Sequence, residues 1–209
     1  VSIATGMTVV MIIKRFTTPP AVRGAGVANI TTYGPDMGTI NSRTKATVGA
    51  VLPGTLAGPL HWNSYYDSPG TLHNLTVMFT PTGYVPVQGS VEFTLSSKSW
   101  VIDTELPKLK VLEPAGVEVS TTWDQANRFM LIRLLNRPLL AGRPVKLSLP
   151  AVHTPPAAEP AGTVMVTTRS FVNYMPGMAF TLLGDIIDGP TAMPTDNIVA
   201  APLTAPLTG

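Results

Sequence analysis

The clearest pattern along the chain is a pair of alternating segments, Leu75–Thr80 and Ser90–Leu95. Apolar residues recur at every second position in both segments, which is the period of a strand with one buried face. The connector between them, residues 81–89, is rich in Pro and Gly, so the two strands are predicted to be antiparallel neighbours. The pattern indicates half of a β-sandwich. The apolar positions are Leu75, Val77, Phe79, Val91, Phe93 and Leu95.

Most of the remaining chain also has the character of short strands. Helix signals are nearly absent, because 21 Pro and 18 Gly are spread along the sequence. About ten strands in all predict an all-β, immunoglobulin-like antiparallel β-sandwich, with a turn at Asp124–Asn127. The further predicted strands are Ile3–Ile13, Gly26–Tyr33, Lys45–Leu52, Ser99–Asp103, Val117–Thr121, Arg128–Leu135, Pro144–Leu149, Gly162–Phe171 and Gly177–Leu183.

Proline-rich segments divide the chain into three parts. Residues 1–20 form an N-terminal apolar strand followed by the hinge Thr17–Pro20, residues 21–188 form the sandwich, and residues 189–209 form a Pro/Thr/Ala-rich tail. The tail repeats Ala-Pro-Leu-Thr at 201–204 and 205–208, which favours an extended polyproline-like conformation. Thr beside Pro also makes the tail a candidate for O-linked glycans.

Four segments together resemble a known repeat. They are Leu75–Thr82, Val85–Leu95, Leu139–Pro150 and Gly162–Thr168. Their order resembles the β-sandwich repeat of large extracellular surface and fibre proteins of algae and other protists. The resemblance spans Leu72–Phe171 and implies a cell-surface or fibrous role with no catalytic residues. The stretch before His61 has no counterpart in that pattern.

The composition limits how the chain can stay soluble and which partners it can bind. Charged residues are only 12% of the sequence, against about 25% in typical domains. Solubility must then come from neutral polar residues, from attached sugar, or from burial against other copies of the chain. No basic cluster is large enough for nucleic-acid binding. The triplets beginning at Asn29 and Asn74 are candidate N-glycosylation sites.

The N-terminal apolar run is the candidate for self-assembly. Val9, Met11 and Ile13 alternate with Val10 and Ile12, so a strand here is apolar on both faces. The run is too short for a membrane span, which needs about 20 residues. It is either a central strand of its own sandwich or a strand donated to a neighbouring copy.

Candidate sites of other kinds are few. No catalytic constellation stands out, so no enzyme activity, metal or cofactor is expected. Asp185 and Asp188 are expected to serve turn chemistry. The aromatic cluster Trp62, Tyr65 and Tyr66 either stacks on a sugar ring or packs beneath a loop.

The sequence therefore predicts a structural subunit of an extracellular or cell-surface, glycosylated filament or surface layer. Its copies are expected to polymerise head-to-tail by β-strand addition. One alternative is a carbohydrate-binding or adhesive β-sandwich module that uses the aromatic cluster. A third is a jelly-roll viral capsid subunit. This alternative is weakened because the chain has no basic arm with which to package nucleic acid.

Overall fold

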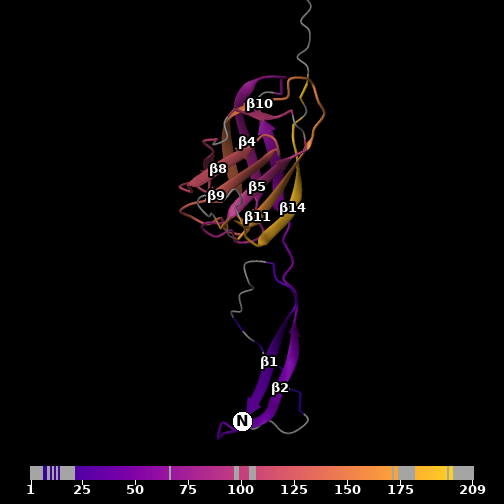
Figure 1. Cartoon of the computed structure of the whole chain (residues 1–209), viewed down its shortest axis with the longest axis vertical. Coiled ribbons are helices and arrows are strands. Elements are labelled where there is room, and N and C mark those ends of the chain that lie inside the picture. The colour runs from indigo at the N-terminus through magenta and orange to yellow at the C-terminus, as the bar shows by residue number, and fades with distance from the viewer. Residues whose placement is uncertain are drawn as a thin grey trace, which may run out of the picture.

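The structure, a computed structural model, describes residues 7, 8, 10, 12, 14, 22–65, 67–96, 99–103, 107–170, 172–173, 182–196, 198 and 199. Every regular element in these ranges is a strand. Figure 1 shows a body that holds most of the strands and a hairpin, β1–β2, that extends from one end. The strands are β1 (Gly26–Tyr33), β2 (Thr39–Val48), β3 (Ala57–Ser64), β4 (Leu72–Thr80), β5 (Ser90–Leu95), β6 (Val101–Ile102), β7 (Lys110–Glu113), β8 (Val119–Asp124), β9 (Phe129–Leu134), β10 (Val145–His153), β11 (Thr163–Arg169), β12 (Val172–Asn173), β13 (Leu182–Leu183) and β14 (Ile186–Pro194).

The body is a sandwich of two antiparallel sheets. One sheet has the order β3-β4-β10, and β10 pairs on its other side with β6 and β7. The other sheet has the order β14-β11-β5-β9-β8. Isolated parallel bridges, Gly54 to Asp188 and Trp62 to Thr195, join the β3 side of the first sheet to β14 of the second. One side of the sandwich is thereby closed by backbone contacts.

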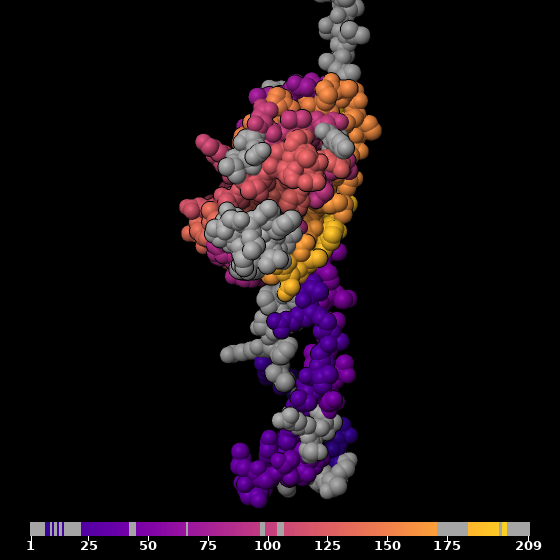
Figure 2. Space-filling view, viewed as in Figure 1, coloured from indigo at the N-terminus to yellow at the C-terminus, as the bar shows by residue number. Residues whose placement is uncertain are grey.

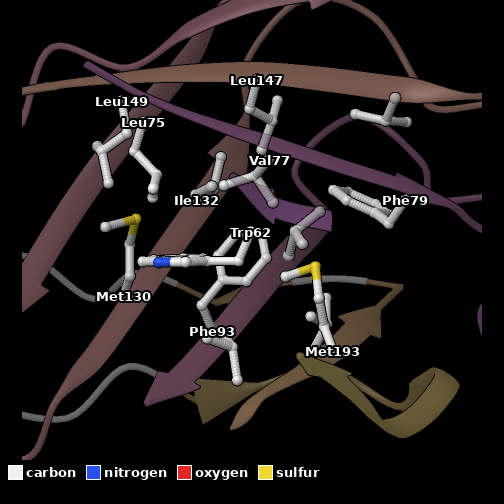
Figure 3. Packing of buried hydrophobic residues seen from close by; sticks show 14 of the residues in the cluster. Trp62, Leu75, Val77, Phe79, Phe93, Met130, Ile132, Leu147, Leu149 and Met193 are labelled. Atoms are coloured by element: carbon white, nitrogen blue, oxygen red, sulfur yellow. The ribbon is translucent and has the colours of Figure 1, made fainter. Parts of the chain in front are cut away.

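The core lies between the two sheets and is built from the alternating positions. All six apolar residues of the opening pattern are buried. Trp62 of β3 packs edge-on against Phe93 of β5, with ring centroids 6.2 Å apart, and against Trp100 at 6.0 Å. Phe79 makes a similar contact with Phe93 at 6.1 Å. Such contacts across the layers hold the two sheets together, and Figure 3 shows Trp62, Phe79 and Phe93 among the residues of the core.

The predicted fold class, an all-β immunoglobulin-like sandwich, is confirmed. The predicted turn at Asp124–Asn127 is also present, because these residues connect β8 to β9. The prediction that the strands at 75–80 and 90–95 are neighbours is wrong. β4 pairs with β3 and β10, whereas β5 pairs with β9 and β11 in the opposite sheet. The Pro/Gly-rich connector crosses between layers, which places both apolar faces on the same core.

The predicted domain boundaries also need correction. β14 runs from Ile186 to Pro194, so the sandwich continues beyond residue 188 into the predicted tail. Residues 26–48, assigned to the sandwich, form a separate hairpin that pairs with no other strand of the described chain. The described residues of the N-terminal run are not in a strand, and residues 200–209 lie outside the described part.

Candidate functional site

The hairpin β1–β2, residues 26–48, is the most unusual surface of the molecule, and we call it the arm. Its strands pair antiparallel, with Gly26 opposite Val48 and Tyr33 opposite Thr39. The tip is closed by the Gly34 amide, which donates to the Gly38 carbonyl at 2.8 Å. Asp36 accepts from the Gly38 amide at 3.3 Å, the hydrogen bond expected of an Asx residue in a turn. The local sequence Gly-Pro-Asp therefore specifies the tip without help from the body.

The arm buries almost none of its side chains. Ile40 is 68% exposed, and nearly every other described position on both strands is exposed as well. Figure 2 shows the arm as a narrow projection from the body. No third strand of the described chain pairs with β1 or β2, so each keeps one open edge. The exposed large apolar residues of the arm are Val27, Ile30, Tyr33, Met37, Ile40 and Val48.

The arm as it stands lacks the packing that stabilises a β-sheet. An isolated two-stranded hairpin is marginally stable in water, and an open strand edge is a template for pairing with another chain. The arm has both open edges and apolar side chains on its faces. It is therefore the surface of this molecule that gains most from a partner.

The root of the arm, in contrast, is firmly attached to the sandwich. Arg23 and Val51 exchange backbone hydrogen bonds of 3.1 and 2.9 Å at the base of the arm. Gly54 donates to the Ile187 carbonyl at 2.8 Å, and its own carbonyl accepts from the Gly189 amide at 2.8 Å. These bonds connect the segment after β2 to the edge strand β14.

A buried carboxylate lies beneath this root. Asp188 is 0% exposed. It accepts hydrogen bonds from the Thr168 hydroxyl at 2.8 Å, from the Thr82 amide at 3.2 Å and from the Thr82 hydroxyl. Asp188 therefore lies within strand β14, and its carboxylate is paired with hydrogen-bond donors of the sandwich. The expectation that it stabilises a turn is wrong.

Two other carboxylates have shifted pKa values. Burial raises the pKa of Glu92, while its ion pair with Arg169, 2.7 Å from Nε to Oε1, opposes that rise. Asn127 donates from its side-chain amide at 2.6 Å and its backbone amide at 3.0 Å, which lowers the pKa of Asp124. Both groups have structural partners. Within the described ranges, no group of three or more His, Asp or Glu residues could hold a metal ion.

The predicted assembly run is only partly described. Met7, Val10 and Ile12 are exposed, and Val10 and Ile12 are each 82% accessible. Val9, Met11 and Ile13 lie outside the described residues. Donation of this run to another copy stays a prediction.

The predicted aromatic cluster does not form a sugar-binding surface as a unit. Trp62 is 1% exposed because its side chain points into the core, so of the two roles considered for this cluster Trp62 has the packing role and does not contact a glycan. Figure 3 shows its ring among Phe93, Met130 and Ile132. Tyr65 is 77% exposed, since it follows the last residue of β3 and points away from the core. Tyr66 lies outside the described residues.

Both candidate N-glycosylation sites are sterically open. Asn29 is exposed on β1 of the arm, and Asn74 is exposed on β4, between buried His73 and buried Leu75. Alternation along the strand turns the Asn74 side chain away from the core. Modification at either position stays a prediction.

Sequence reasoning missed the arm as a separate unit. Its strand Gly26–Tyr33 was predicted, yet its partner was placed too late, at 45–52 in place of β2. One signal could have identified it. β1 has no face made only of large apolar residues, because Val27 shares a face with Asn29 and Thr31. Strands that line a sandwich core keep one apolar face.

No protein-family model matches the chain, and no curated protein matches it. Among solved structures, a cohesin module from a family 33 glycoside hydrolase of Clostridium perfringens is 8% identical, with TM-score 0.40, over 70% of this chain and 98% of that one. The RrgA Jo.In complex is 10% identical, with TM-score 0.36, over 68% and 80%. BcpA, the major pilin subunit of Bacillus cereus, is 13% identical, with TM-score 0.35, over 83% and 47%. Because these scores are low, the conclusions below depend on contacts within this chain.

No helix in the described ranges is long and apolar enough to cross a membrane.

Proposed function

We propose that this chain is a structural subunit of an extracellular, glycosylated filament or surface layer. Its copies join head-to-tail, and the arm is the element that enters the neighbouring copy by strand addition. The N-terminal run Met7–Ile13 is a second apolar segment that docks on the neighbouring copy as an added strand. The body serves as the rigid spacer between junctions.

The observation that carries this proposal is the exposure of the arm on both faces and both edges. Backbone pairing with a neighbour satisfies the open amides and carbonyls of a strand edge, and it removes apolar side chains from water. A second copy of the chain offers strand edges and exposed apolar residues of its own. Self-association is therefore the simplest way to cover the arm.

The root of the arm supports a structural role. A subunit that transmits force needs a stiff connection between junction and body. The paired backbone hydrogen bonds at Arg23–Val51 and around Gly54 supply that connection. A mobile tether would need none of them.

The extracellular setting is supported by surface chemistry. Only 12% of the residues are charged, so neutral groups or attached sugars must keep the subunit soluble before it assembles. Asn29 and Asn74 offer exposed positions for such sugars. The resemblance of residues 72–171 to algal and protist surface repeats points the same way.

Two truncations test the proposal. One lacks residues 1–20 and the other lacks residues 1–48, and both keep every described buried apolar residue of the sandwich. Sedimentation velocity and negative-stain microscopy measure assembly, and cooperative thermal unfolding shows that the body is intact. We expect fibres or oligomers from the full chain and monomers from the chain without residues 1–48. Undiminished fibres from a folded chain without its arm would overturn the proposal.

A further inference from the structure

Charge is unequally divided between the two parts of the chain. Residues 1–50 contain five basic residues and one acidic residue, a net charge of +4. Residues 51–209 contain nine basic and eleven acidic residues, a net charge of −2. Lys45 on β2 of the arm and Arg23 at the root of the arm are both exposed. The part of the molecule that needs a partner is therefore cationic.

Acidic residues outnumber basic ones at the end of the body remote from the arm, which we call the distal end. Strand directions define it, because β3, β8, β10 and β14 all finish there and β4 starts there. The distal loops contact one another, and the Val199 amide, for example, donates to the Asp67 carbonyl at 2.9 Å. These loops and strand ends carry the acidic residues Asp67, Asp103, Asp124, Glu159 and Asp196, against Lys108 and Arg128 among the described basic residues.

The distal end also offers apolar surface. Tyr65, Leu72 and Val199 are exposed there, next to the loops that carry the carboxylates. The arm has the matching combination, with Val27 and Ile40 exposed on the hairpin that also carries Lys45. An interface of this kind combines apolar burial with complementary charge at its rim.

Other ways of covering the arm are less favourable. Two arms that paired with each other would bring two positively charged segments together, because residues 26–48 contain Arg43 and Lys45 against Asp36, and like charges across an interface oppose association. The arm leaves the body at the opposite end from the distal loops (Figure 1), so it cannot reach its own distal end. A second copy placed in line with the first brings its acidic distal end to the cationic arm, and it lies in the direction in which the arm projects.

We infer that the arm of one copy docks on the acidic distal end of the next copy, which produces an open head-to-tail chain. This inference rests on the proposed function, and it names the receiving surface. Opposite charges bring the arm to the distal end, and apolar contacts with strand pairing then hold it. Added salt weakens the attraction, because exposed charges are screened within about 8 Å at physiological ionic strength.

Charge reversal at each surface tests the inference. The arm variant carries Arg23→Glu and Lys45→Glu, and the distal variant carries Asp67→Lys and Asp103→Lys. All four side chains are exposed, and Asp103 contacts His153 Nε2 at 2.9 Å, so the thermal unfolding of each variant is compared with that of wild type to show that the sandwich is intact. We expect each variant alone to raise the dissociation constant for self-association, measured by sedimentation, about tenfold or more. Mixing the two variants places opposite charges at every junction again, and we expect the mixture to recover the wild-type assembly.

The control variant carries Glu113→Lys and Glu118→Lys, which make the same change in charge at exposed positions on the arm side of the sandwich. We expect it to assemble like wild type. A distal variant that assembles as well as wild type overturns this inference and leaves the proposed function standing. If the mixture of the arm variant and the distal variant does not assemble like wild type, the inference is also overturned. A wild-type chain that remains monomeric at every concentration overturns the proposed function and this inference together.

Discussion

Gly54 lies directly against the buried carboxylate of Asp188. The two residues form an isolated parallel bridge at the root of the arm, and a Cβ added to Gly54 would lie 2.6 Å from Asp188 Oδ1. The hydroxyl of Thr82 occupies the same space. This close approach of backbone to carboxylate attaches the arm to the sandwich, and only glycine leaves room for it.

Replacing Gly54 with Ala should destabilise the sandwich by about 2 kcal/mol, because the methyl group must displace either Asp188 or Thr82. The measurement is the midpoint of urea unfolding. Gly49→Ala is the matched control, since nothing lies within 4 Å of its added Cβ, and its effect should stay within about 0.5 kcal/mol. Equal effects of the two substitutions would contradict the assigned contact.

Replacing Asp188 with Ala should cost about 3 kcal/mol in the free energy of unfolding. The substitution removes the acceptor of the Thr168 and Thr82 hydroxyls in a site without access to water. Asp188→Asn keeps one carbonyl oxygen, so it should cost less than Asp188→Ala. Chemical denaturation of both variants checks the order. A reversed order would show that an acceptor oxygen for the Thr168 and Thr82 hydroxyls is not what stabilises this position.

The parts of the fold that sequence predicted are those set by local alternation. β5 was predicted with its observed bounds, because Val91, Phe93 and Leu95 face the core and both ends carry turn residues. The pairing of strands was not predictable in the same way. β4 and β5 have the same pattern whether they lie side by side or face each other across a core, since alternation reports only which face is buried.

Two of the missed strands, β14 and β3, share a physical cause. β14 contains Gly189, Pro190 and Pro194, residues that normally interrupt strands. It is an edge strand, so proline is tolerated where no ladder amide is required. β3 begins Ala-Gly-Pro and is also an edge strand. Edge positions depend on tertiary context, which the local sequence does not encode.

Trp62 and Tyr65 show why the site was harder to predict than the fold. They are three residues apart in one aromatic cluster, yet one is a core residue and the other is exposed. Trp62→Ala should cost about 4 kcal/mol in unfolding free energy, while Tyr65→Ala should change it by no more than about 0.5 kcal/mol. Thermal or urea unfolding distinguishes them. A small effect at Trp62 would show that its ring does not lie between the sheets.

Glycan attachment can be tested site by site. Thr31→Ala and Thr76→Ala each remove one acceptor triplet without changing the Asn itself. In a secretory host that adds N-linked glycans, the intact mass should exceed 22.1 kDa, and each substitution should lower it by one glycan. Peptide mapping after glycosidase treatment assigns the position. A mass equal to that of the polypeptide would remove the glycoprotein part of the proposal.

The pH dependence of stability should show a contribution from Glu92. Burial raises its pKa above the ordinary value of 4.5, although Arg169 lies close. The folded state therefore binds the Glu92 proton more tightly than the unfolded state does, so the free energy of unfolding falls as pH rises through the interval above 4.5. The variant Glu92→Gln lacks this titration and keeps an acceptor for the Arg169 guanidinium. Urea unfolding of both proteins from about pH 4 to about pH 8 should show wild type losing stability relative to the variant as pH rises. A difference that grows in favour of wild type over that range would mean that the ion pair with Arg169 outweighs burial.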